Sequence, residues 1–214
     1  MINKEFDIIV IGAGVSGLIL ADEITKRTNK TVLLLERKKE LKFEKNLCFW
    51  NIPINILYEA ANNKWKKLCV IIKGKKISIN SNGIEYLGIK SINLYNFFLN
   101  RLKKRKTFKI IMGENIKSLK SKKDNVEIIT ANKIYNSQLL FDSRLDTKLE
   151  NSHRLLQHFY GAEITFKESI INKDEVVLMD IQNKKNNFNF IYILPFSKKK
   201  NVSRNNIFFE EDFR

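Results

Sequence analysis

The sequence contains few cysteines and few histidines, which argues against a disulfide framework and against a zinc site. Cys48 and Cys69 are the two cysteines among 214 residues. They are too few for a disulfide framework, so we expect both to be free in a reducing compartment. The two histidines, His153 and His158, are five residues apart and would not share one helix face. We therefore predict no zinc site and no other metal site.

Long apolar runs are also missing, whereas basic residues are abundant. No run reaches the ~18 residues that a membrane-spanning helix needs, and no secretion signal opens the chain. The 39 Lys and Arg against 23 Asp and Glu give a formal net charge of +16. No nucleic-acid recognition motif accompanies this charge, so nucleic acid is not an expected partner. We expect a cytoplasmic protein that can lie peripherally on a membrane surface.

Residues 6–36 have the pattern of a strand, a glycine-rich turn, a helix and a second strand. The apolar run 8–11 leads into the sequence GAGVSG at 12–17, and an apolar helical stretch follows. A second apolar run, 31–35, ends at Glu36. This order is far more specific than an isolated glycine motif, and it predicts a dinucleotide-binding unit.

The residue types of this motif suit the binding of a diphosphate and a ribose. Gly12 allows a tight turn, Gly14 lets the backbone approach a pyrophosphate, and Gly17 allows the helix to pack closely on the strand. The helix N-terminus offers N–H donors and a positive dipole end. Glu36, about twenty residues beyond the last glycine, is placed to accept hydrogen bonds from an unphosphorylated ribose, which both FAD and NAD carry.

FAD is the preferred cofactor because residues 12–36 resemble the start of flavoproteins of the glutathione-reductase-like class. Ligands of open α/β sheets gather at the carboxyl ends of strands. Asp142 and Arg144 follow the apolar run 139–141, so they either lie near the cofactor or pair to close a turn. The predicted cofactor-binding residues are Gly12, Ala13, Gly14, Gly17, Glu36, Arg37 and Asp142.

The rest of the chain predicts further strands and one more helix. Residues 67–80 have the pattern of a β-hairpin and residues 94–105 that of a short amphipathic helix. Residues 39–46 have the pattern of a polar loop that leads to LCFW at 47–50. β-rich runs fill 155–209. We predict an α/β fold with a Rossmann-like FAD/NAD(P)-binding domain at 1–146, interrupted by inserted β-hairpins. A partial, β-rich substrate domain follows at 147–214.

Six segments occur in an order that resembles the flavin-dependent lycopene β-cyclase family. They are GAGVSG, CFW, FDSR, LLQHFYGAEI, LMDIQ and IYILPFS. The resemblance implies an enzyme that forms β-rings on linear carotenes such as lycopene without net oxidation. A proton adds to the terminal double bond, the carbocation cyclises, and loss of a proton completes the ring. The resemblance also implies reduced FAD, with NAD(P)H as the electron source, and a membrane surface that supplies the apolar substrate.

The chain departs from this family after IYILPFS. A family glutamate that is a leading candidate for the catalytic acid/base corresponds to Arg204 here, and Glu210 and Glu211 come later in the sequence. The catalytic residue is therefore unknown. Members of the family continue beyond this point, so we interpret the chain as an incomplete, inactive N-terminal part. A shortened gene, a change of reading frame near 198–200, or the choice of the expressed segment would each explain why the chain is incomplete.

Two other functions share the same N-terminal motif. One is a redox flavoenzyme, such as a hydroxylase or a carotenoid dehydrogenase-like protein. The other is a non-catalytic remnant that binds a nucleotide. Products made from a linear carotene separate these alternatives, because a cyclase adds rings without changing the unsaturation.

Overall fold

The computed structural model describes residues 3–41, 45–52, 56–131, 133–144, 155–168, 172–182, 188–197 and 200–210. The chain divides into two compact units, one formed by 1–46 and 90–147 and the other by 47–89 and 148–214. The sequence predicted that 47–89, which contains the hairpin at 67–80, belongs to the first domain. In the structure this segment groups with the second unit, because its strand β5 (Lys67–Ile72) pairs in parallel with β13 (Glu175–Ile181).

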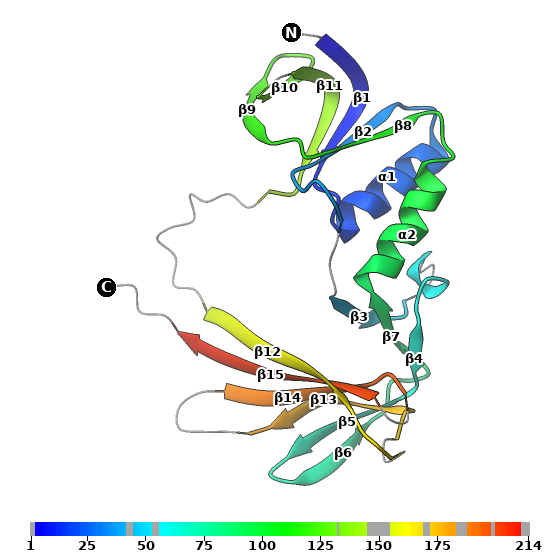
Figure 1. Ribbon diagram of the computed structural model, residues 1–214, viewed down its shortest axis with the longest axis vertical. Helices are drawn as coiled ribbons and strands as arrows, with labels where there is room; N and C mark the ends of the chain where they lie inside the picture. The colour runs from blue at the N-terminus through cyan, green and yellow to red at the C-terminus, as the bar shows by residue number, and fades with distance from the viewer. Residues whose placement is uncertain are drawn as a thin grey trace. The chain divides into compact units, whose positions relative to one another are not determined.

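The first unit is a mixed α/β structure around a six-stranded sheet (Figure 1). The sheet order is β8-β2-β1-β11-β10-β9, in which the first four strands are parallel and β10 is antiparallel to both of its neighbours, β11 and β9. The predicted strand–turn–helix–strand at the start of the chain is confirmed. The elements are β1 (Asn3–Ile11), α1 (Val15–Arg27), β2 (Val32–Glu36), α2 (Ser91–Leu102), β8 (Phe108–Met112), β9 (Ile116–Ser121), β10 (Val126–Thr130) and β11 (Ile134–Asp142).

The central strands of this sheet are buried on both faces, as their continuous apolar sequences require. Leu33 and Leu35 of β2 join a cluster that contains Tyr135 of β11. Val32 and Leu34 point to the opposite face because side chains alternate along a strand. Helix α1 covers that face, where close packing of the helix on β1 fixes the position of the glycine turn.

Helix α2 begins three residues earlier than the sequence predicted and ends three residues earlier. Its start is fixed by Ser91, whose N–H donates to the Lys45 carbonyl at 2.8 Å and whose Oγ accepts from the Lys45 N–H at 3.2 Å. Its buried stripe is Ser91, Leu94, Phe98 and Leu102. Arg105, which the sequence placed inside the helix, follows it in a turn and points to α1.

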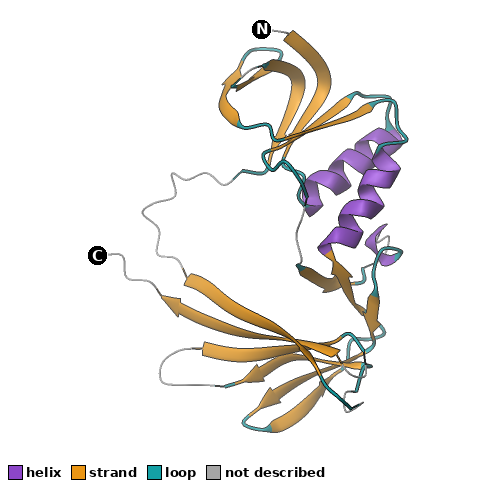
Figure 2. Cartoon of the chain, in the orientation of Figure 1, coloured by secondary structure: helices purple, strands orange, loops and turns teal. Residues whose placement is uncertain are grey.

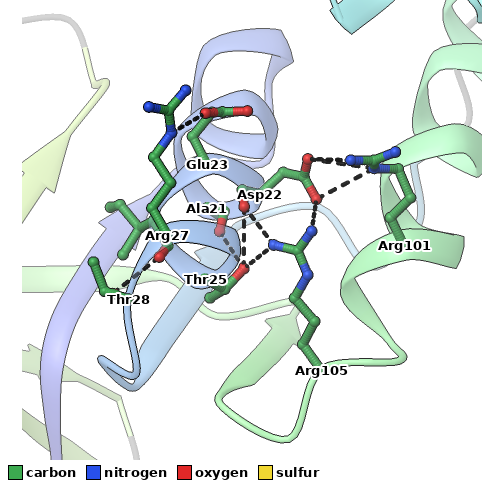
Figure 3. Close-up of polar contacts among 9 residues, drawn as sticks. Ala21, Asp22, Glu23, Thr25, Arg27, Thr28, Arg101 and Arg105 are labelled. Atoms are coloured by element: carbon green, nitrogen blue, oxygen red, sulfur yellow. Dashed lines mark hydrogen bonds and ion pairs between the residues drawn. The ribbon is translucent and has the colours of Figure 1, made fainter.

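An ionic cluster joins α1 to α2 (Figure 3). The Asp22 carboxylate of α1 is fully buried and contacts Arg101 at 3.2 Å and Arg105 at 2.9 Å. Arg105 also donates to the Asp22 carbonyl oxygen and, at 2.6 Å, to the Thr25 hydroxyl. The buried charge is thus compensated by two guanidinium groups, which is the condition under which a buried carboxylate is tolerated.

The second unit consists mainly of β-strands (Figure 2), which form two sheets. The six-stranded sheet has the order β12-β15-β14-β13-β5-β6, and a three-stranded sheet has the order β3-β7-β4. Besides β5 and β13, the elements are β3 (Asn46–Trp50), η1 (Ile56–Tyr58), β4 (Asn63–Trp65), β6 (Lys75–Ile79), β7 (Tyr86–Lys90), β12 (Leu155–Thr165), β14 (Phe188–Pro195) and β15 (Lys200–Glu210).

Two local predictions for the second unit have different outcomes. The predicted hairpin is confirmed as β5–β6, and both turn residues, Lys73 and Gly74, have positive φ values of 50° and 76°, as tight hairpin turns require. The segment LCFW, expected to follow the polar loop 39–46, is part of a strand, because 46–50 form β3. Pairing with β7 in a small sheet gives this short apolar segment a strand conformation.

One aromatic and three aliphatic side chains form the buried core of the second unit: Trp65, Leu68, Val176 and Leu194. Trp65 is buried, and its indole N–H donates to the Pro195 carbonyl at 3.1 Å. The hydroxyls of Tyr192 and Tyr86 are 2.9 Å apart, and burial raises the pKa of Tyr192. Neither Cys48 nor Cys69 takes part in a disulfide. His153, Glu211 and the predicted boundary segment 147–154 lie outside the described residues.

Candidate functional site

The turn after β1 requires glycine at two positions. Gly12 has a φ of +102°, and a Cβ there would lie 2.2 Å from the Ser143 Oγ. A Cβ at Gly17 would lie 2.1 Å from the Gly12 carbonyl oxygen and 3.4 Å from Val10. The Gly12 N–H also donates to the Leu35 carbonyl at 2.8 Å. The turn therefore lies directly against the ends of β1 and β2.

Gly14 has a different environment, open to a ligand. It is the N-cap residue of α1, with a φ of −69°, and α1 has neither a side-chain cap nor an acidic residue in its first turn. A Cβ at Gly14 would meet nothing within 4 Å. The first N–H groups of an α-helix have no intrahelical partner, and they attract an anion together with the helix dipole. This end of α1 fits a diphosphate.

The Glu36 carboxylate is oriented by two backbone groups at the end of β2. It accepts the Ala13 N–H at 2.7 Å and the Lys38 N–H at 2.9 Å. One carboxylate oxygen takes each bond, so both oxygens retain capacity to accept a further hydrogen bond. Two ribose hydroxyls are donors of the kind that this carboxylate can accept.

Two neighbours of Glu36 come from distant parts of the chain. The Glu114 N–H donates to the Glu36 carbonyl at 2.9 Å. Burial raises the pKa of Tyr95 in α2, and the nearby Glu36 carboxylate raises it further. No local pattern around Tyr95 or Glu114 could have pointed to this carboxylate.

The carboxyl ends of β1 and β11 lie side by side at the same turn. The two strands are parallel, with Ile11 opposite Asp142. From β1 the chain proceeds to β2 and β8 on one side and later reaches β11 on the other. Ligands of open α/β sheets bind where the strand order reverses in this way. The turn, the N-terminus of α1 and Glu36 thus lie at the point where the strand order reverses.

Ser143 is a site residue that the sequence analysis did not single out. Its Oγ donates to the Ile11 carbonyl at 2.6 Å, and its N–H donates to the same oxygen at 3.2 Å. These bonds fix the end of β11 against the glycine turn. The quoted segment FDSR contains this serine, so the available signal was its position directly after an apolar strand.

The Asp142 and Arg144 side chains form a close pair at this strand end. The Arg144 guanidinium donates to the Asp142 carboxylate at 2.7 and 3.0 Å, and these bonds hold the pKa of Asp142 below its ordinary value. The pair closes a turn, and it does so beside the glycine turn. Both interpretations weighed from the sequence are therefore compatible with its position.

The predicted residues differ in how closely the structure groups them. Gly12, Ala13, Gly14, Gly17 and Glu36 come together in one turn and its neighbouring strand end. Arg37 follows with an exposed side chain. Arg204 lies in β15, with its backbone paired to Gly161 and Tyr192, and its side chain is outside the described part. The role of the predicted cofactor-binding residues stays a prediction, and so does the assignment of Arg204 to the position of the family's catalytic glutamate.

The described ranges contain neither a metal cluster nor a membrane-spanning helix. No three His, Cys, Asp or Glu side chains among them could hold a metal ion. No helix within these ranges is long and apolar enough to cross a membrane.

Several solved structures have a fold similar to that of this chain. PqsL, a probable FAD-dependent monooxygenase from Pseudomonas aeruginosa, has a TM-score of 0.66 at 11% identity, over 97% of this chain and 61% of that one. A flavoprotein/dehydrogenase from Cytophaga hutchinsonii has a TM-score of 0.70 at 14% identity, over 98% of this chain and 56% of that one. The halogenase PltM in complex with phloroglucinol and FAD has a TM-score of 0.68 at 12% identity, over 94% of this chain and 51% of that one.

These similarities concern the fold, since all three identities are low. The chain spans between 51% and 61% of the length of these structures. No curated protein sequence matches it significantly. The family model described as "Lycopene cyclase protein" matches residues 7–212, which is nearly the whole of the 214-residue chain. The chain therefore belongs to the lycopene cyclase family.

Proposed function

We propose that the first unit binds FAD in the manner of glutathione-reductase-like flavoproteins. The open N-terminus of α1 would hold the diphosphate, and the preoriented Glu36 carboxylate would accept the ribose hydroxyls. Gly12 and Gly17 keep the turn close enough to β1 for this arrangement. When bound, reduced flavin supplies an electron-rich ring for acid/base or electrostatic chemistry. FAD in the complex of PltM, which shares the fold, supports the choice of cofactor.

We further propose that the protein acts in carotenoid biosynthesis, as a lycopene β-cyclase, an isomerase of linear carotene end groups. The observation that carries this proposal is the family match over residues 7–212. The expected partners are lycopene, NAD(P)H as the source of electrons, and a membrane surface. The reaction needs a positioned acid and a water-excluding pocket, because water captures an exposed carbocation.

The position of Arg204 leads us to propose that the chain as it stands cyclises lycopene poorly. Loss of a positioned proton-transfer group typically costs ~10²–10⁴-fold in rate. An arginine remains protonated in proteins and cannot act as that acid. We expect Arg204→Glu to increase the yield of cyclic product from lycopene, FAD and a reductant. Rapid cyclisation by the chain with Arg204 would contradict this assignment and point to another carboxylate, such as Glu210.

Cofactor binding is tested separately from catalysis by titrating the chain with FAD and following flavin fluorescence. Hydrogen bonds to a charged acceptor contribute ~1.5–3 kcal/mol, so Glu36→Gln should weaken FAD binding by roughly 10- to 100-fold. Glu59→Gln is the control, because Glu59 is an exposed carboxylate of the second unit. Equal affinities for the two variants would refute the ribose role of Glu36.

A redox flavoenzyme is the second candidate, and it is favoured by the fold shared with a monooxygenase and a halogenase. Its distinguishing result is an oxygenated or desaturated carotene in the same assay. New rings with unchanged unsaturation support the cyclase proposal. FAD binding without any carotene product from either the chain or Arg204→Glu supports a non-catalytic nucleotide-binding protein.

A further inference from the structure

The β5–β6 hairpin of the second unit presents exposed apolar side chains on one face of the larger sheet. Ile72 is 40% exposed, Ile77 46% and Met179 of the neighbouring strand β13 37%. Val70 is opposite both Ile77 and Met179, and Ile72 follows Val70 by two residues, so the four side chains share a face. We call them the apolar hairpin face. Single exposed apolar residues need no explanation, whereas a contiguous patch marks an interaction site.

This face continues the buried core of the unit toward the hairpin turn. Leu68, two residues before Val70 on the same strand, is 2% exposed and belongs to the core cluster of Trp65. Ile79 is opposite Leu68 and packs against the same cluster. Exposure therefore rises along β5 from the core to Ile72, the last residue of the strand. The hairpin extends an apolar layer beyond the side chains that cover it.

Two lysines flank the apolar hairpin face at the turn. Lys73 is in the turn, and Lys75 is directly opposite Ile72. Both are exposed, and neither makes an ion pair within the described ranges. The positive φ values of Lys73 and Gly74 belong to a tight two-residue turn that holds the two strands together. Cationic and apolar groups are thus fixed side by side at one end of the sheet.

The acidic groups of the adjoining strands lie on the other face of the sheet. Glu175 and Asp180 are the acidic residues of β5, β6, β13 and β14. They are in register with Lys67 and Ile71, which alternate with the residues of the apolar hairpin face and so point away from it. Glu175 forms an ion pair with Lys76 there. The apolar hairpin face therefore carries positive charge without a neighbouring carboxylate.

This combination suits an anionic lipid surface better than a second copy of the chain. β6 is the edge strand of its sheet (Figure 1), and lysines on an edge strand oppose pairing with another chain. A two-fold contact through the same face would also bring the lysines of both copies together. At a membrane, by contrast, apolar side chains enter the boundary between headgroups and acyl chains, while lysine ammonium groups stay among anionic headgroups.

We propose that the apolar hairpin face, with Lys73 and Lys75, is the surface by which this chain docks on an anionic membrane. Ile72 and Ile77 enter the headgroup boundary, and the two ammonium groups contact lipid phosphates. The inference rests on the membrane partner of the proposed function and names its surface. It involves neither flavin nor carotene, so its test contains neither. The net charge of +16 alone would attract lipid without selecting this hairpin.

The test is titration of the purified chain with phosphatidylglycerol–phosphatidylcholine vesicles at low ionic strength, with bound protein measured by flotation. The double variant Ile72→Ser, Ile77→Ser should weaken binding by about tenfold or more, because it removes the apolar surface that enters the membrane. The matched control is Ile84→Ser, Ile92→Ser. These isoleucines are 44% and 41% exposed and lie outside the hairpin, so binding should be unchanged.

A second pair of variants tests the lysines. Lys73→Gln, Lys75→Gln should weaken vesicle binding by about tenfold, since each lysine at a membrane surface contributes appreciably to the attraction. Lys106→Gln, Lys123→Gln removes the same net charge from exposed positions of the first unit. This control should weaken binding by no more than about twofold, because salt screens charges that do not reach the lipid.

A third measurement detects insertion directly. The emission added by Ile77→Trp should be quenched by lipids brominated on their acyl chains, whereas that added by Ile84→Trp should not. Equal vesicle binding by the hairpin and control variants, or equal quenching at the two positions, overturns the proposal even if the parent chain binds vesicles, in which case the membrane partner stands without this surface. A dimer in sedimentation that Ile72→Ser, Ile77→Ser dissociates also overturns it, because the face then joins two copies.

Discussion

Gly14 and Gly17 lie in one turn but have opposite surroundings. The space around the Gly14 Cα is open, whereas Gly17 contacts the Gly12 backbone. Gly17→Ala should lower the free energy of unfolding by ~1–3 kcal/mol, as overpacked sites do. Gly14→Ala should retain most of the stability but weaken FAD binding, because its methyl group occupies the approach of the diphosphate. Urea denaturation and flavin titration of both variants measure the two effects. Similar stability losses in both would contradict this difference.

Asp7 gives the first unit a specific dependence on pH. The Thr31 N–H, with further help from Lys30 and the Thr31 hydroxyl, lowers the pKa of Asp7 to about 2. An ordinary aspartate has a pKa of ~4. The stabilisation is therefore complete above about pH 4 and is lost as the pH falls toward the folded-state value. Asp7→Asn should be less stable than the parent at neutral pH, and this difference should shrink as denaturation is measured below pH ~4. A difference that grew on acidification would refute the assignment.

At the scale of elements, the pairing of α1 with α2 depends on a buried charge (Figure 3). Removing one partner of a buried pair leaves the other charges uncompensated, which typically costs ~3–5 kcal/mol. Because Arg101 is 33% exposed, we expect the lower part of this range for Asp22→Ala, about 3 kcal/mol. Urea denaturation measures the change.

The neighbouring residue provides the control for that substitution. Glu23 pairs with Arg27 on the exposed face of the same helix at 2.6 Å, and such surface pairs contribute ~0–1 kcal/mol. Glu23→Ala should therefore have a small effect. If Asp22→Ala cost no more than Glu23→Ala, the cluster would not be holding the two helices together.

At the scale of the whole molecule, the net charge of +16 predicts attraction to anionic surfaces. Lysine and arginine near a membrane contribute ~1 kcal/mol each through the surface potential, and salt screens this attraction. We expect the chain to float with anionic lipid vesicles at low ionic strength, to be released by salt, and not to float with neutral vesicles. Flotation that is insensitive to salt, or equal with neutral lipid, would contradict an electrostatic peripheral association.

The glycine turn could be predicted from sequence because its determinants are local. A positive φ at Gly12 and the close approach at Gly17 each require a residue without a Cβ, and an apolar strand before the turn identifies its context. Glu36 could be placed for the same reason, because it ends the next strand. The hairpin at 67–80 was likewise determined by neighbouring residues.

The sequence by itself therefore determined the turn, the orientation of α1 and β2 around it, and the family to which the segments belong. Only the tertiary structure decided that 47–89 joins the second unit, that Ser143 lies against Gly12, and that Met179 lies beside Val70. These features depend on strands and side chains that are far apart in the chain. An apolar run in the sequence indicates that a strand is buried. It does not indicate which strand it pairs with, because many runs have a similar composition, and the pairing is decided by packing in the folded chain.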